Sequence, residues 1–261
     1  MKPQTILSFT SIPQRLPYID HVFRKHAETA EANGMSVCLA LQEDAVPALT
    51  VYQRGLVETG RIELLTVPGD YGSNTKWACA RSKYPSARLV VVDDDRLYAP
   101  DEVAELLAWS DRFPSAFVCR AIRTPRRFGR EIVGYQVYDG EADDFAPLVT
   151  SRDIERGGVL EPGSDIVEHW AGTVYPPFFG SLMLAIEARA LCPHDDDVFT
   201  TEMLRRTRVP AILMASPRRV FAYPYRRVFP ELRDSALGGT RASSERTWKS
   251  ICKFRRRWES E

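Results

Sequence analysis

The first 120 residues alternate between short apolar runs and longer segments in which apolar residues recur at helical spacing. The apolar runs have the length of strands and lie at residues 5–10, 36–41, 61–67 and 88–92. The segments with helical spacing lie at residues 17–33, 45–59 and 75–83, and Gly34 and Gly60 follow two of them. Glycine is a common helix stop, and a regular alternation of strand and helix is typical of an open, doubly wound sheet. The pattern therefore predicts an α/β fold with a mostly parallel sheet.

The run at residues 88–92, RLVVV, is almost entirely apolar. Such a strand suits the middle of a parallel sheet, where helices cover both faces. Pro100 opens a further helix, and Asp101 and Glu102 lie in its first turn, where the helix dipole favours acids. The polar residues between this strand and this helix are therefore expected at the end of a buried strand.

The second half of the chain has a less regular pattern. It predicts a strand at 115–122, loops with short strands at 123–168, a helix at 197–206 and a short strand at 210–215. Residues 170–190 are apolar and aromatic, with Pro176 and Pro177 in their middle. Without a visible repeat or linker, the sequence predicts one domain over residues 1–245 and a basic, aromatic tail at 246–261. The domain divides into a regular half at 1–122 and a less regular half at 123–245.

Charge and cysteine usage narrow the possible functions. The chain has 35 basic and 35 acidic residues, a net charge of +0, so no overall field attracts nucleic acid. The five cysteines are scattered without a CxxC pair, which argues against both a disulfide framework and a zinc site. No stretch approaches the ~18 apolar residues of a membrane span, and the first residues lack the apolar core of a signal peptide. We expect a cytoplasmic protein that binds no nucleic acid.

Three adjacent acids, Asp93, Asp94 and Asp95, directly follow the buried strand. In open α/β sheets, ligands bind outside the carboxyl ends of the strands. Close carboxylates repel one another by about 1 kcal/mol per pair even in water, and a divalent cation would remove that conflict. Their hard oxygen ligands suit Mg²⁺ or Mn²⁺. The alternative is a solvated acidic turn.

Two further segments are expected at the same edge of the sheet. In DYGSNTK at 70–76, Lys76 lies in the first turn of a helix, where the dipole disfavours a cation, so an anion nearby would explain it. At the exit of the first strand, Thr10, Ser11 and Arg15 suit a nucleotide and its phosphates. An exposed lysine and an ordinary strand-to-helix turn explain these features as well.

The later motifs are a second acidic cluster and an aromatic segment. The acids at 195–197 follow His194, and one of them would cap the next helix, whereas another could act as general base on an acceptor hydroxyl. His194 itself suits either a metal ligand or a surface residue. In the aromatic segment, His169, Trp170 and Tyr175 offer a floor for a sugar, although aromatic runs more often belong to a core.

In this order, the motifs resemble those of GT-A-type, nucleotide-sugar-dependent bacterial glycosyltransferases. The resemblance rests on residues 6–16, 70–76, 90–101, 169–177 and 194–199. It implies a GT-A-like fold in which residues 1–122 bind the nucleotide and residues 123–245 form the acceptor side. It also implies an Mn²⁺ or Mg²⁺ cofactor, a nucleotide-sugar donor with a UDP-sugar favoured, and a hydroxyl acceptor in bacterial glycan or polysaccharide synthesis.

The resemblance also assigns roles to single residues. The acidic run matches the DxD motif, so Asp95 would bind the metal directly, and Asp93 would lie near the ribose or the metal. Asp196 and Asp197 resemble the stretch that supplies the general base in inverting members. The residues expected around the donor are Thr10, Ser11, Arg15, Tyr71, Lys76, Asp93 and Asp94. Those expected on the acceptor side are His169, Trp170 and Tyr175.

Three other classes compete with this interpretation. A HAD-type phosphatase also has a strand followed by DxD, with Asp93 as nucleophile, but that motif normally ends the first strand of its core. A nucleotidyltransferase should carry a Gly-rich signature with Arg or Lys after the first strand, which residues 10–16 lack. A non-catalytic domain that binds carbohydrate or nucleotide would keep the fold without needing a metal.

The tail contains RTWKSICKFRRRW at 246–258. Aromatic and basic residues together suit the surface of an anionic membrane, which predicts peripheral contact with the inner face of the membrane if the acceptor is lipid-linked. A helix that packs its tryptophans on the body of the protein is the alternative. The basic cluster at 123–130 suits an anionic acceptor or a solvated loop.

Overall fold

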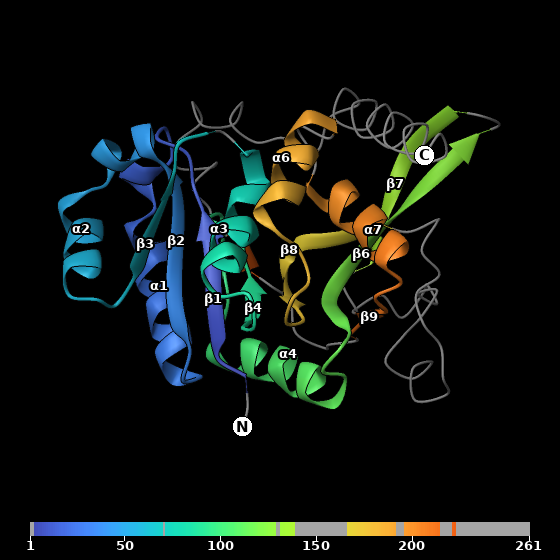
Figure 1. Cartoon of the computed structure of the whole chain (residues 1–261), viewed down its shortest axis with the longest axis horizontal. Coiled ribbons are helices and arrows are strands. Elements are labelled where there is room, and N and C mark those ends of the chain that lie inside the picture. The colour runs from blue at the N-terminus through green and yellow to red at the C-terminus, as the bar shows by residue number, and fades with distance from the viewer. Residues whose placement is uncertain are drawn as a thin grey trace.

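A sheet runs through the middle of the molecule (Figure 1) in the computed structural model, which describes residues 3–69, 71–128, 131–138, 166–191, 196–214 and 221–222. The first four strands are β1 (Thr5–Thr10), β2 (Ser36–Gln42), β3 (Glu63–Val67) and β4 (Arg88–Val91). They pair in parallel in the order β3-β2-β1-β4. The carboxyl ends of all four therefore meet at one edge, and the acidic run leaves β4 there.

Helices and short 3-10 turns connect these strands as the apolar pattern predicts. They are η1 (Leu16–Tyr18), α1 (Asp20–Ala32), η2 (Glu43–Ala48), α2 (Val51–Glu58), η3 (Gly72–Asn74) and α3 (Thr75–Lys83). After β4 come the two-residue strand β5 (Arg96–Leu97) and the helix α4 (Pro100–Arg112). Local capping fixes some of their ends. Thr50 accepts a hydrogen bond from the backbone N–H of Gln53, whose side chain accepts one from the backbone N–H of Thr50, a capping box that starts α2.

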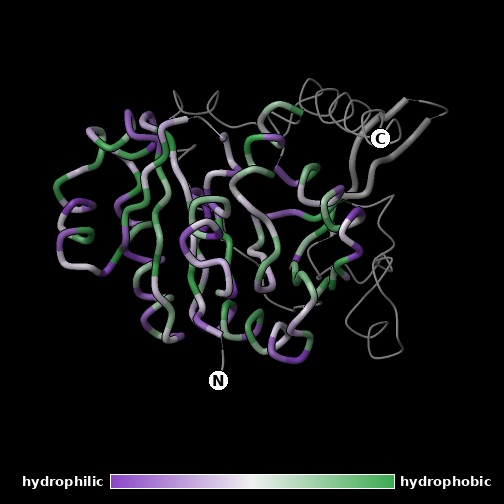
Figure 2. Tube along the Cα trace, viewed as in Figure 1, coloured by the Kyte–Doolittle hydropathy of each residue, from purple (hydrophilic) through white to green (hydrophobic). Residues whose placement is uncertain are grey.

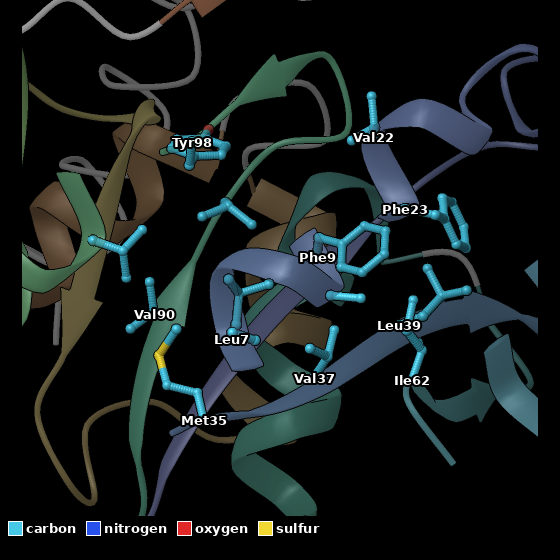
Figure 3. Packing of buried hydrophobic residues seen from close by; sticks show 14 of the residues in the cluster. Leu7, Phe9, Val22, Phe23, Met35, Val37, Leu39, Ile62, Val90 and Tyr98 are labelled. Carbon is cyan, nitrogen blue, oxygen red and sulfur yellow. The ribbon is translucent and has the colours of Figure 1, made fainter. Parts of the chain in front are cut away.

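The sheet separates two hydrophobic cores, and alternate residues of each strand enter one or the other. Ile6 and Leu89 pack with α3 and two later helices, whereas Leu7 and Val90 pack with α1, α2 and α4. Figure 3 shows part of the second core between α1 and the strands. Figure 2 shows hydrophobic residues concentrated along the strands, while α1 and α2 alternate between hydrophobic and hydrophilic residues. The predicted α/β class with helices on both faces is confirmed.

The second half of the sheet is largely antiparallel. It contains β6 (Phe117–Phe128), β7 (Glu131–Tyr138), β8 (Ile166–Tyr175) and β9 (Ala211–Leu213), with α6 (Leu182–Leu191), α7 (Asp196–Thr207) and a separate two-residue strand β10 (Phe221–Ala222) that pairs with β5. The order continues from β4 through β8 and β6 to β7, with β9 alongside β6.

Two expectations for this half need correction. Residues 123–128 and 131–138 form a long hairpin of β6 and β7, where loops with short strands were expected. The arginines at 123–128 hide the strand pattern of that part of β6, because strands away from the middle of a sheet need not be apolar. The apolar and aromatic segment at 170–190 was assigned no helix, whereas the structure has α6 over most of its second half. Residues 139–165 and the tail at 246–261 lie outside the described residues, and no helix among those described has the length and apolarity to cross a membrane.

Strand β8 brings the second half of the chain to the edge where the acidic run lies. It is antiparallel to β4, with Thr173 opposite Val91, so the residues before Thr173 extend past the end of β4. The pairing of β8 with β6 shifts between Cys119, which lies opposite Thr173, and Ala121, which lies opposite Glu168. The extra residues on β8 form a bulge. Gly172 lies in that bulge with φ +88°, and a Cβ there would come within 3.2 Å of Leu106. Bulges commonly re-aim side chains beside active sites.

Arg81 fastens α3 to the loops around it. Its buried guanidinium donates hydrogen bonds to the carbonyl oxygens of Phe179, Pro176, Ala87, Pro85 and Tyr84, at distances from 2.7 to 3.2 Å. These bonds join the end of α3 to the chain that leaves β8. The position of α3 along the sheet therefore depends on this one side chain.

We predict that Arg81→Met lowers the free energy of unfolding by about 3 kcal/mol or more, because several buried carbonyls lose a charged donor. Urea unfolding followed by circular dichroism measures the change. Lys83→Met on the same helix is the control, since Lys83 is exposed and pairs with Glu63 at the surface. Equal stability of the two variants would contradict the fastening role of Arg81.

Candidate active site

The three carboxylates after β4 point to different partners. Each faces a basic side chain of the protein: Asp93 faces Lys76 at 2.6 Å, Asp94 faces Arg15 at 2.5 Å, and Asp95 faces Arg96 at 3.9 Å. The repulsion expected from three adjacent acids is therefore eased by cations of the chain itself. This observation weakens the argument that the acidic run by its charge alone requires a metal.

Asp94 links the acidic run to the exit of β1. It is buried, and it accepts hydrogen bonds from Ser11 Oγ at 2.6 Å and from Arg15 Nη1. Burial raises the pKa of Asp94, and the Arg15 guanidinium opposes that rise. Thr10 donates to the carbonyl of Ala40 at 2.7 Å. Ser11 and Arg15, expected around a nucleotide, thus have a defined structural partner, and their contact with a nucleotide stays a prediction.

Lys76 joins the two acidic clusters that the sequence singled out. Its ammonium lies 2.6 Å from Asp93 Oδ1 and 2.9 Å from Asp196 Oδ2, although 120 residues separate Lys76 from Asp196. The side chain is 4% exposed. Burial would lower the pKa of Lys76, but Asp196 and Asp93 outweigh it and raise that pKa well above its usual value, so the ammonium stays charged. The anion that the sequence predicts beside Lys76 is present as carboxylates of the protein.

Asp196 is held in the first turn of α7 by partners on three sides. Ser73 Oγ of η3 donates to its Oδ1 at 2.7 Å, and Lys76 and His169 Nδ1 lie near its Oδ2. Burial raises the pKa of Asp196, but Lys76 and His169 more than offset this and hold it well below its ordinary value. Oδ2 is buried and accepts no hydrogen bond of good geometry from the described residues, even though it lies within ion-pair distance of Lys76.

His169 connects Asp197 to the core. Asp197 Oδ1 accepts hydrogen bonds from the backbone N–H of His169 at 3.0 Å and from its Nδ1. On the other side of the ring, Nε2 contacts the Tyr175 hydroxyl at 2.8 Å, which contacts Thr200 Oγ1 at 3.0 Å. His169 is 1% exposed and Tyr175 is fully buried. In this structure neither ring faces solvent, so neither lies where an acceptor could stack on it.

Trp170 is the predicted acceptor-side residue that keeps an accessible surface. The Arg96 guanidinium lies 5.1 Å from the centre of its ring, a cation–π contact. Tyr71, expected near the donor, is partly buried and packs against the core beside α3. His194 and Asp195 lie outside the described residues.

Two residues that the sequence did not single out hold the backbone of Asp93. His26 of α1 is buried, and its Nε2 lies 3.2 Å from the Asp93 carbonyl oxygen. The Tyr98 hydroxyl accepts the Asp93 N–H at 3.1 Å and donates to the Trp170 carbonyl at 2.8 Å. Tyr98 thereby ties the acidic run to β8. In the sequence, the nearness of Tyr98 to the three acids was the one feature that could have pointed to its role. His26 lies within a regular helix, and nothing in the sequence around it marks it as part of the site.

His169, Asp196 and Asp197 could hold a divalent cation. One donor atom from each lies within 4.8 Å of the others, the one such group of three or more among the described residues. The two carboxylate oxygens suit Mn²⁺ or Mg²⁺, whereas an imidazole nitrogen is not a preferred ligand of Mg²⁺. Asp196 Oδ2, which accepts no hydrogen bond from the described residues, could take a place in such a group. Asp93 and Asp95 belong to no group of that size in the described chain, so their role as metal ligands stays a prediction.

No family model and no curated protein matches the sequence. Among solved structures, the chain is similar to a 4-diphosphocytidyl-2C-methyl-D-erythritol synthase, with 10% identity, a TM-score of 0.49, and coverage of 89% of this chain and 98% of the other. It is similar to an apo UDP-glucose pyrophosphorylase, with 10% identity, a TM-score of 0.48, and coverage of 98% and 100%. A 4-diphosphocytidyl-2C-methyl-D-erythritol synthase from Anaerococcus prevotii gives 10% identity, a TM-score of 0.47, and coverage of 82% and 90%. Likeness at this level says nothing about what this chain binds.

The buried His26 predicts a loss of stability in mild acid. Burial lowers its pKa to about 4, only partly opposed by the hydrogen bond to the Asp93 carbonyl and the Asp93 charge. The unfolded chain then binds a proton below about pH 6.5 that the folded protein takes up only near pH 4. We expect the free energy of unfolding to fall by up to about 3 kcal/mol as the pH drops through this window.

Urea unfolding between pH 7 and pH 4.5 measures this loss. His26→Gln should lose less stability over that range than the wild type. His21→Gln is the control, because His21 lies near the surface of the same helix and should leave the loss in place. A wild-type pH profile that His26→Gln leaves unchanged would contradict the assignment.

Proposed function

We propose that the protein transfers a sugar from a nucleotide-diphosphate donor to a hydroxyl acceptor, as a metal-dependent glycosyltransferase. The observation that carries the proposal is the buried Lys76 ammonium between Asp93 and Asp196. It brings the acidic run of the nucleotide-side half together with the acids of the acceptor-side half, at the edge where open α/β sheets bind ligands.

On the donor side, the exits of β1 and β4 supply the residues for a nucleotide diphosphate. Arg15 and Ser11 lie together with Asp94, and Lys76 lies beside Asp93. A cation held by Asp95 and Asp93 would stabilise the charge that develops on the leaving diphosphate. Arg15 and Lys76 would orient the phosphates, and the carboxylates would keep both basic groups in place before the donor arrives.

On the acceptor side, Asp197 is the better general base of the two helix acids. Asp196 is locked by Lys76 and Ser73 and its pKa is held low, so it removes a proton poorly. The Asp197 side chain is more exposed, 19% against 11% for Asp196. The bonds from His169 would orient Asp197 toward an acceptor hydroxyl, and Trp170 beside Arg96 would offer the sugar a surface. A base opposite the leaving group gives inversion at the anomeric carbon.

The proposed donor is a UDP-sugar, and the proposed acceptor is a glycan or lipid-linked sugar of bacterial polysaccharide synthesis. The basic, aromatic tail at 246–261 supports a place at the inner face of the membrane, since a lipid-linked acceptor lies there. The tail lies outside the described residues, and its amino-acid composition is the observation that supports this location.

A screen of nucleotide sugars for metal-dependent hydrolysis identifies the donor, and Asp95→Asn then tests the metal ligand. We expect this variant to lose about 100-fold or more in turnover, because the leaving diphosphate loses its counter-charge, while its circular dichroism stays that of the wild type. Asp101→Asn, an exposed acid in the first turn of α4, is the matched control. Wild-type turnover by Asp95→Asn would refute the role of Asp95.

The variant Asp197→Asn distinguishes a role of Asp197 as general base from a role as metal ligand. A lost base lowers kcat by about 100-fold or more and leaves the KM for the donor nearly unchanged. A lost metal ligand raises the KM for the donor and weakens Mn²⁺ binding. Steady-state kinetics at several Mn²⁺ concentrations distinguish the two outcomes, and full activity would exclude both.

A further inference from the structure

The Lys76 ammonium lies between one carboxylate of each candidate metal group. Asp93 belongs to the predicted metal pair, and Asp196 belongs to the group formed with His169 and Asp197. Lys76 contacts both, at 2.6 and 2.9 Å. A cation that coordinates either carboxylate must therefore approach a buried positive charge.

We propose that Lys76 competes with a divalent cation for Asp93 and Asp196, so that the free protein binds the cation weakly and binds it tightly only together with a nucleotide diphosphate. The inference rests on the proposed function for the identity of the nucleotide. The competition between Lys76 and the cation does not depend on it.

Geometry keeps Lys76 from leaving the site. Its side chain is almost entirely buried, and its backbone carbonyl accepts a hydrogen bond from Ser8 Oγ of β1. Helix α3, which carries it, is fastened at its other end by Arg81. An ammonium that cannot swing into solvent stays within a few ångströms of an incoming cation, where repulsion in a partly desolvated site is strong.

One ammonium shared by two carboxylates leaves the pair with surplus negative charge. That surplus attracts a cation, and Lys76 repels it, so the two effects oppose each other in the free protein. A diphosphate changes the balance because its oxygens can accept both the ammonium and the cation. Binding of the two ligands is then coupled, and the coupling is reciprocal: each raises the affinity for the other.

Titration with Mn²⁺ alone, followed by the electron paramagnetic resonance signal of free Mn²⁺, tests the competition without any nucleotide. Lys76→Met keeps most of the unbranched apolar stem of the side chain and removes its ammonium. We expect it to bind Mn²⁺ at least about tenfold more tightly than the wild type. Lys83→Met on the same helix, which removes an exposed ammonium, should match the wild type. Equal or weaker Mn²⁺ binding by Lys76→Met would overturn the proposal.

Adding UDP tests the coupling and separates it from the function. UDP should tighten Mn²⁺ binding to the wild type about tenfold or more, and the gain should shrink in Lys76→Met. If UDP fails to bind with Mn²⁺, the proposed donor is wrong, whereas tighter binding of Mn²⁺ alone by Lys76→Met still supports the competition. An equal gain in both proteins would overturn the coupling.

A measurement on the unaltered protein covers the case in which Lys76→Met does not fold. Nuclear magnetic resonance of the lysine ammonium groups, with the Lys76 signal assigned through Lys76→Arg, follows the competing charge directly. The signal should stay in place with low-millimolar Mg²⁺ and move when UDP is added with it. A signal that stays in place while Mg²⁺ and UDP bind, or that already moves with Mg²⁺ alone, would contradict the proposal.

Discussion

A single buried ammonium joins the two halves of this protein. Lys76 lies in the first turn of α3, Asp93 follows β4, and Asp196 opens α7. Burying a charged group is costly unless it is paired, and the Lys76 side chain is 4% exposed, so its ammonium requires the carboxylates of Asp93 and Asp196 beside it. The rest of the site is arranged around that requirement: Ser73 satisfies the other oxygen of Asp196, and Arg81 keeps α3 in position.

The antiparallel strand β8 makes this meeting possible. Because β8 runs antiparallel to β4 and Thr173 lies opposite Val91, the start of β8 lies beyond the end of β4. The bulge of β8, with Gly172 in the left-handed region, sets His169 against Asp197. Asp197 of α7 is thereby held against β8, and the buried ring of His169 contacts the Tyr175 hydroxyl in the core through its other nitrogen.

Rigidity in the site comes from side chains of several elements that hold the acidic run in place. Tyr98 and His26 hold the backbone of Asp93, and Ser11 and Arg15 hold the side chain of Asp94. Each contact crosses between elements, so the acidic run is supported from β1, α1 and β8 at once. Charges that are already fixed in place need little reorganisation during a reaction. Electrostatic stabilisation of a transition state is strongest under that condition.

Local apolar periodicity was enough to predict the α/β class, the four parallel strands and the helices between them, because it decides which face of each element is buried. The sequence also singled out Lys76, the acidic run and the helix acids, since charges at strand ends conflict with local stability. Their partners follow only from the folded arrangement, in which Lys76 is shared by Asp93 and Asp196 and Arg15 pairs with Asp94. The burial of His169 and Tyr175 likewise follows from the fold. Pairings between residues far apart in the chain depend on strand order and register, which no local pattern contains. For the same reason the β6–β7 hairpin, the bulge of β8 and the supporting residues His26 and Tyr98 became visible only in the folded chain.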